Sequence, residues 1–101
     1  MIKLTTEQED IIDHLWKNNG NAYNLHKASE ECQELGLILN QYLLKSKGMI
    51  PEQAIIDEIG DVYIRMEILK KMYSNEEIQK RIDYKLSKFK EYVDHKLYTQ
   101  I

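Results

Sequence analysis

The sequence of 101 residues is poor in the residue types that build disulfide frameworks and sheets. It contains one cysteine, one proline and four glycines. Cys32 has no second cysteine in the chain with which to pair, so an internal disulfide and a thiolate metal site are both excluded. Clusters of β-branched residues are few, and no stretch reads convincingly as a strand. These absences favour an all-α chain.

Long apolar runs and a strong excess of one charge are absent as well. No apolar run is long enough to span a membrane, and the N-terminus lacks an apolar signal region, so we expect a cytoplasmic protein without a membrane partner. The 14 basic and 17 acidic residues give a formal net charge of −3, which argues against a general nucleic-acid binder. With 43% hydrophobic and 31% charged residues, residues 1–101 are expected to form one globular domain.

Apolar residues recur at spacings of three and four along most of the chain, which predicts four helices. Their expected ranges are about 6–20, 22–47, 51–73 and 74 to the C-terminus. Thr6-x-x-Glu9 and Ser74-x-x-Glu77 fit capping boxes that open the first and the fourth helix. Pro51 suits the first turn of the third. The predicted architecture is a four-helix bundle.

The second and third of these helices are apolar on more than one face. Leu37 and Leu44 fall opposite the main apolar stripe of the second helix, and Ile64, Ile68 and Met72 form a second apolar face on the third. A helix that is apolar nearly all round must be covered all round. In a chain of this length the simplest cover is another copy of the chain, so we predict a homo-oligomer.

Two pairs of carboxylates border the apolar stripes of the same two helices. They are Glu31-x-x-Glu34 on the second helix and Glu58-x-x-Asp61 on the third. Residues three apart share a helix face, so side-by-side packing of the helices brings four carboxylates together, while Glu30 points away. Such a cluster of like charges is costly unless a cation compensates. Oxygen ligands without histidine or cysteine suit Mg²⁺ or Mn²⁺.

Gly36 and Gly60 lie in the interiors of these two helices, where each costs about 1 kcal/mol relative to alanine. They favour a close approach of the two helices, which lets the carboxylate pairs converge. Hard cations held there bridge phosphate oxygens and activate a water for attack at phosphorus. Basic side chains of a neighbouring helix neutralise the charge that develops on the phosphates. The chemistry indicated is hydrolysis of a phosphoanhydride.

The chain resembles the MazG-like nucleoside triphosphate pyrophosphohydrolases of the all-α NTP pyrophosphatase superfamily. The resemblance lies in Glu30-Glu31-x-x-Glu34 followed by Glu58-x-x-Asp61, and it extends over roughly residues 20–95. It implies a helical bundle assembled as homodimers or dimers of dimers. It also implies Mg²⁺-dependent cleavage of a (d)NTP between its α- and β-phosphates, which yields a nucleoside monophosphate and pyrophosphate. The short members of the family, phage-type ones included, are the most similar in size.

Carried over by position, the resemblance assigns roles to acidic and basic residues. The metal ligands would be Glu31, Glu34, Glu58 and Asp61, and Glu30 would join them in catalysis by orienting its neighbours or positioning water. Lys88-Phe89 matches a Lys-Phe pair in the family's C-terminal helix, whose basic residues contact phosphate, but Tyr92 stands where the family has arginine. The candidate phosphate ligands are therefore Lys88, Lys85, Arg81 and Arg65, and the candidate base contacts are Asn24 and Trp16.

Two alternatives stay open at this point. One is a related pyrophosphatase specific for dUTP or dCTP, since such enzymes share similar helices. The other is an oligomeric helical interaction module without catalytic activity, in which converging carboxylates would have no purpose. A di-iron carboxylate bundle is disfavoured, because it uses Glu-x-x-His pairs and none of the three histidines follows a glutamate at that spacing.

Overall fold

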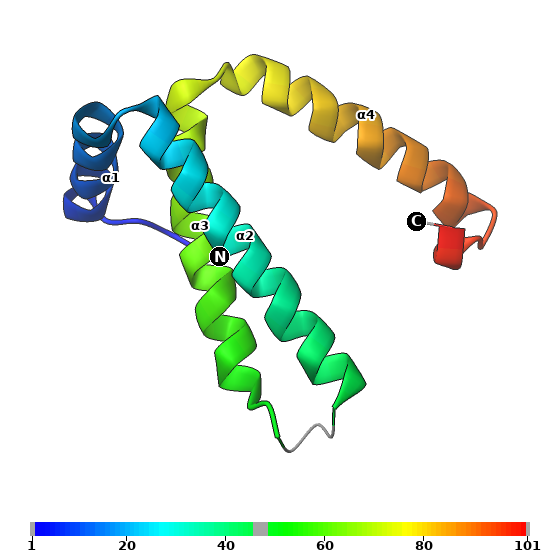
Figure 1. Cartoon of the computed structure of the whole chain (residues 1–101). Coiled ribbons are helices and arrows are strands. Elements are labelled where there is room, and N and C mark those ends of the chain that lie inside the picture. Colours follow the sequence, from blue (N-terminus) through cyan, green and yellow to red (C-terminus); the bar gives the residue numbers. More distant parts are fainter. Residues whose placement is uncertain (1, 46–48, 101) are drawn as a thin grey trace.

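A computed structural model describes residues 2–45 and 49–100 of the chain. All regular structure in this part is helical (Figure 1). The elements are α1 (Thr6–Asn19), α2 (Asn21–Leu44), α3 (Glu52–Met72), α4 (Asn75–Asp94) and the short 3₁₀ helix η1 (Tyr98–Gln100). The prediction of an all-α chain with four main helices is confirmed. No helix in these ranges has both the length and the apolar composition needed to cross a membrane.

The helices α2 and α3 run antiparallel, side by side, and α1 packs against both near the start of α2 (Figure 1). We call the α2–α3 pair the hairpin. The most deeply buried side chains come from these three helices: Ile12 of α1, Asn24 and Ala28 of α2, and Ile68 of α3. Burying an isoleucine side chain contributes about 1.5–3 kcal/mol. This small core holds α1 and the hairpin together.

The N-terminal cap of α1 lies one residue earlier than predicted. Thr5, not Thr6, is the cap: its hydroxyl accepts a hydrogen bond from the Gln8 backbone N–H at 3.1 Å. The Gln8 side chain in turn accepts from the Thr5 backbone N–H at 2.9 Å. A glutamine serves as well as a glutamate in the third helical position, so the box begins at Thr5. At the other end Gly20 adopts φ 82°, a left-handed conformation that favours glycine, and α2 follows at once.

The predicted ends of the later helices are partly right. Ser74 caps α4 as expected, because its hydroxyl accepts from the Glu77 backbone N–H at 3.2 Å. The helix α2 ends at Leu44, and Lys45 is already extended. The predicted end at Lys47 is therefore too late, and Lys47 itself lies outside the described residues.

The two helix-interior glycines do not mark a close contact between α2 and α3. A methyl group at Gly36 or at Gly60 would meet no heavy atom within 4 Å beyond the adjacent backbone of its own helix. The prediction that these glycines allow a close helix approach is wrong within the single chain. Both positions face open space.

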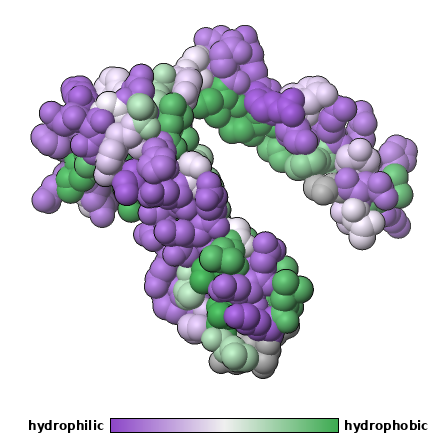
Figure 2. Space-filling view, in the orientation of Figure 1, coloured by the Kyte–Doolittle hydropathy of each residue, from purple (hydrophilic) through white to green (hydrophobic). Residues whose placement is uncertain are grey.

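The helix α4 leaves the hairpin instead of closing a bundle with it. In the described part of the chain it packs along its length against none of α1, α2 and α3 (Figure 1). Its apolar side is turned towards the hairpin across an open gap (Figure 2). The radius of gyration is accordingly 16.7 Å, against about 13 Å for a compact chain of this length. One chain by itself therefore has the four predicted helices without closing them into a bundle, and the predicted assembly as a homo-oligomer stays a prediction.

Candidate metal centre

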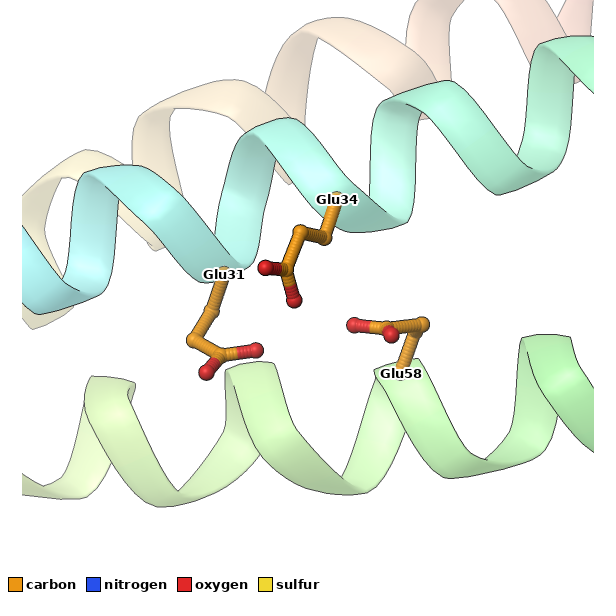
Figure 3. A group of neighbouring side chains, drawn as sticks. All are labelled: Glu31, Glu34 and Glu58. Atoms are coloured by element: carbon orange, nitrogen blue, oxygen red, sulfur yellow. The ribbon is translucent and has the colours of Figure 1, made fainter.

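Three carboxylates meet between α2 and α3. Glu31 and Glu34 project from α2 and Glu58 projects from α3 into the same space (Figure 3). One carboxylate oxygen of each residue lies within 4.8 Å of those of the other two. The spacing of three residues places the two α2 side chains on one face, and the packing of α3 sets Glu58 opposite them. The structure thus brings together three of the four predicted metal ligands.

Asp61, the fourth predicted ligand, stands just outside this three-carboxylate group. It lies about one turn beyond Glu58 on α3, and its side chain is exposed. Its charge still acts on the group, since it contributes to raising the pKa values of Glu31 and Glu58. Asp61 therefore borders the group without being one of its three converging members.

The three-carboxylate group lacks compensating partners. Oε2 of Glu31 and Oε2 of Glu58 are buried, and neither has a hydrogen-bond partner among residues 2–45 and 49–100. Burial raises the pKa of both carboxyl groups above the usual glutamate range, and the neighbouring charges of Glu34 and Asp61 raise it further. Among the described residues, no basic side chain forms an ion pair with any of the three. The group is an uncompensated concentration of negative charge.

These donors fit a hard divalent cation. Carboxylate oxygens are the protein ligands that Mg²⁺ takes, usually a few of them together with water and substrate phosphates. A cation would offset the repulsion among the three charges and would give the two buried oxygens a partner. No imidazole or thiolate belongs to the group, so it does not match the nitrogen and sulfur ligands that dominate zinc sites. Glu31, Glu34 and Glu58 are the residues that would hold Mg²⁺.

Glu30 faces away from the three-carboxylate group, as its helical position predicted. Its carboxylate pairs with Lys27 at 3.1 Å and with the His26 imidazole at 3.0 Å, both on α2. The hydrogen bond from Lys27 holds the pKa of Glu30 below its usual range. Glu30 is thus engaged on the outer side of α2. Of the five acids predicted for catalysis, Glu30 is the one whose carboxylate pairs with basic side chains of its own helix.

The basic residues of α4 lie away from the three-carboxylate group of their own chain. Lys88 and Arg81 flank the ring of Tyr84, at 5.3 and 5.0 Å from its centre, and Lys85 lies 5.4 Å from the centre of the Phe89 ring. Because α4 extends away from the hairpin (Figure 1), these three predicted phosphate ligands are not brought to the carboxylates within one chain.

Asn24 and Trp16, the predicted base contacts, lie near the junction of α1 and α2. Asn24 is only 1% exposed, and its side-chain N–H donates to the Leu15 carbonyl at 3.4 Å. Its Oδ1 is buried without a partner. Trp16 is half-buried, and the Lys17 ammonium lies 6.0 Å from its ring. Asn24 ties α1 to α2 and is closed off from solvent in the single chain, and its role in base binding stays a prediction.

No known protein family, no curated protein and no solved structure matches this chain. The likeness to MazG-like enzymes accordingly stays a prediction drawn from the two-part acidic motif. The function has to be inferred from the residues and from their arrangement.

Lys27 was not selected from the sequence. It lies four residues before Glu31 and seven before Glu34, on the same face of α2, and it is half-buried. The hydrogen bond to Glu30 raises its pKa, while the nearby charge of Arg65 on α3 acts in the opposite direction. Arg65, a predicted phosphate ligand, lies on α3 and is half-buried. The spacing of Lys27 from the two glutamates was the signal that could have found it.

Proposed function

We propose that this protein is a nucleoside triphosphate pyrophosphohydrolase that uses Mg²⁺, or Mn²⁺ in its place, to convert a (d)NTP and water into a nucleoside monophosphate and pyrophosphate. The observation that carries the proposal is the three-carboxylate group between α2 and α3, with its two buried oxygens that lack partners. The sequence motif supports the same reaction. We expect the enzyme to act on cytoplasmic nucleotide pools as a homodimer or a dimer of dimers.

Three facing carboxylates are hard to explain as a structural feature. Burying like charges together lowers stability, and apolar or neutral residues of similar size would hold two helices together better. An interaction module without catalytic activity would gain nothing from such an arrangement. A cation that carries a polyphosphate turns the same arrangement into a binding site. The electrostatic cost therefore favours the enzyme over the interaction module.

Each residue of the site would have a definite part in this reaction. Glu31, Glu34 and Glu58 would hold the cation. When bound, Mg²⁺ withdraws charge from the phosphate oxygens and makes a bound water more acidic. Asp61, exposed at the border of the group, would accept the proton of the attacking water. As the new P–O bond forms, the bond between phosphorus and the bridging α–β oxygen breaks, and that oxygen leaves with its electron pair.

The direct test is an assay of pyrophosphate release with Mg²⁺ over the eight common NTPs and dNTPs. We expect release from at least one substrate by the wild type and a fall of more than about 100-fold in Glu34→Gln and Glu58→Gln, since changes to the outer shell alone cost about 10–100-fold. Glu7→Gln, an exposed change on α1, is the matched control and keeps full activity. A preference for dUTP or dCTP would indicate that the protein is one of the related pyrophosphatases that are specific for that nucleotide.

Three results would count against the proposal. Release of phosphate instead of pyrophosphate refutes the bond that is assigned. Full activity in both substituted proteins refutes the site. Absence of any release, together with calorimetry that detects no binding of Mg²⁺ or Mn²⁺ dependent on Glu34 and Glu58, leaves the interaction module as the function.

A further inference from the structure

We propose that Lys27 of α2 and Arg65 of α3 bind a phosphate of the substrate beside the three-carboxylate group, and that Glu30 positions Lys27 for this contact. We call Lys27 and Arg65 the basic pair. The inference rests on the proposed function for the identity of the ligand, which is a polyphosphate held by a cation. It gives the site basic side chains from the hairpin itself, and it gives Glu30 a role away from the cation.

The packing of the hairpin sets the basic pair at one level. In the antiparallel hairpin (Figure 1), a step back along α2 and a step forward along α3 lead in the same direction. Carboxylate oxygens of Glu34 and Glu58 lie within 4.8 Å of each other, so these two residues define a common level. Lys27 lies seven residues before Glu34. Arg65 lies seven residues after Glu58. Both bases therefore stand about 10 Å further along the hairpin, and their long side chains can extend over part of that distance.

Two further observations agree with this register of α2 against α3. Towards the tip of the hairpin, the Tyr42 hydroxyl donates a hydrogen bond to the Glu52 carboxylate at 3.3 Å. Towards α1, Asn24 and Ile68 are each 1% exposed, and each lies three residues beyond a member of the basic pair. Their burial is expected if they face each other. The basic pair thus stands between the carboxylates and the buried core.

Each member of the basic pair shares a helix face with the acids of its own helix. Lys27 lies four residues before Glu31 on α2. Arg65 lies four residues after Asp61 on α3. Residues four apart are neighbours on one face, so each helix carries a base next to its acids, in mirror-image order along the hairpin. The charge of Arg65 acts to lower the pKa of Lys27, as one positive charge does to another.

Lys27 is more enclosed than the other paired lysines. Its side chain is 32% exposed, whereas the other lysines that form ion pairs in the described ranges are 44–73% exposed. Its ammonium contacts Glu30 at 3.1 Å, and Glu30 also pairs with His26 at 3.0 Å. The centre of the Tyr23 ring lies 5.6 Å from the ammonium. An exposed ion pair contributes little to stability, so a ligand that needs the ammonium at this place explains the arrangement better.

The basic pair complements the charge of a polyphosphate. A polyphosphate held by a cation keeps negative charge on the oxygens that do not contact the cation, and the carboxylates repel these oxygens. Lysine binds phosphate as a point charge, and arginine binds it through parallel N–H donors. Arg65 is half-buried, and its guanidinium forms no ion pair with the acids of residues 2–45 and 49–100. A phosphate at this level would meet an ammonium held in place and a guanidinium without a competing acid.

The first experiment measures binding without catalysis. Calorimetry determines the Kd of Mg²⁺ alone and then the Kd of inorganic triphosphate at saturating Mg²⁺. We expect Lys27→Met and Arg65→Met to keep the wild-type Kd for Mg²⁺. Each should raise the Kd for triphosphate at least about tenfold, the loss of one hydrogen bond between charged groups. Lys70→Met is the matched control and keeps both constants, because Lys70 pairs with Glu67 at the same spacing of three residues and lies about 140° around α3 from Arg65.

A double-mutant cycle tests whether Glu30 acts through Lys27. Glu30→Gln keeps the shape of the side chain and removes the charge that holds the ammonium. We expect it to raise the Kd for triphosphate about threefold in the wild type and to have no effect in the Lys27→Met background. Equal effects in the two backgrounds, tighter binding of triphosphate or weaker binding of Mg²⁺ by Glu30→Gln would overturn its positioning role.

The outcomes separate this inference from the proposed function. Triphosphate binding that depends on the basic pair, in a wild type that releases no pyrophosphate, supports the basic pair and refutes the reaction. Pyrophosphate release with an unchanged kcat/KM in Lys27→Met and Arg65→Met supports the reaction and refutes the basic pair. The inference is also refuted if the wild type binds no triphosphate, if either replacement leaves its Kd unchanged, or if either replacement abolishes Mg²⁺ binding.

Discussion

Replacing Glu31 by glutamine tests the electrostatic reasoning about the three-carboxylate group most directly. The change removes one charge and keeps the shape of the side chain. Two unit charges 4.8 Å apart, the limit that encloses the group, repel by about 0.9 kcal/mol in the dielectric of water and about 3.5 kcal/mol at an effective dielectric constant of 20. Because Glu34 is exposed, water screens its repulsion of Glu31, and the lower figure applies to this pair.

We therefore expect Glu31→Gln to be more stable than the wild type by about 1 kcal/mol when divalent cations are removed with EDTA. For a domain of this size that corresponds to a rise in Tm of about 4–8 °C. With Mg²⁺ at 100 times its Kd the wild type gains about 2.7 kcal/mol, while the variant, which has lost a ligand, gains less. The order of the two melting temperatures is thus expected to reverse between EDTA and Mg²⁺.

The assay is thermal unfolding followed by circular dichroism, at one fixed protein concentration because an oligomer melts in a concentration-dependent way. Glu7→Gln, which removes an exposed acid of α1, is the control and should show the wild-type gain with Mg²⁺. A lower Tm of Glu31→Gln in EDTA would refute the repulsion within the group. An equal gain with Mg²⁺ in the two proteins would refute the role of Glu31 as a ligand.

Three further predictions concern the scaffold. Ile68 is 1% exposed, so Ile68→Ala is expected to lower the free energy of unfolding in urea by about 2–5 kcal/mol, and a loss below 1 kcal/mol would contradict its place in the core. Gly60→Ala meets no neighbouring atom and is expected to stabilise by about 1 kcal/mol; destabilisation instead would mean that another copy packs there. Hydrogen bonding and charge from Lys17, together with Lys71, hold the pKa of Asp13 below its usual 3.8, so its contribution to stability is present above that pH and is lost as the pH falls below it. Asp13→Asn should flatten acid unfolding there, and an unchanged acid limb would refute the effect.

The helices were predictable because the signals that define them are local. Ser74 was recognised as a cap from its own neighbourhood, and the structure confirms it with the bond from the Glu77 N–H. The prediction of Thr6 instead of Thr5 as the cap of α1 shows the limit of local signals. Each of the two adjacent threonines is followed three residues later by a side chain that suits a capping box, Gln8 or Glu9. Spacing alone does not choose between neighbouring caps of similar strength.

The candidate site was predictable for residues on one helix and less so across two. Glu31 and Glu34 share a face by spacing alone. Whether Glu58 or Asp61 comes nearest to them depends on how far α3 is rotated and shifted against α2. The side chains that pack between the helices determine that rotation and shift. Local sequence patterns such as caps and periodicity do not predict them.

The surroundings of the glycines and of Asn24 were not predictable from the sequence for a related reason. A glycine within a helix has the same appearance in a sequence whether it faces a neighbour or open space, and here both positions are open. Asn24 is polar and was selected as a candidate base contact, but α1 packs against it and only 1% of it is exposed. Whether a side chain is buried depends on which helix from elsewhere in the chain packs against it.

The sequence by itself determined that this protein is helical, where its helices begin to within a residue or two, and that acids three residues apart on α2 point the same way, because capping and periodicity act within a few residues. The tertiary structure alone decided that Glu58 and not Asp61 comes nearest to those acids, that Asn24 is closed off, and that α4 leaves the hairpin with its apolar side uncovered. Each of these depends on the relative position of helices, which arises from packing between segments that are distant in the chain.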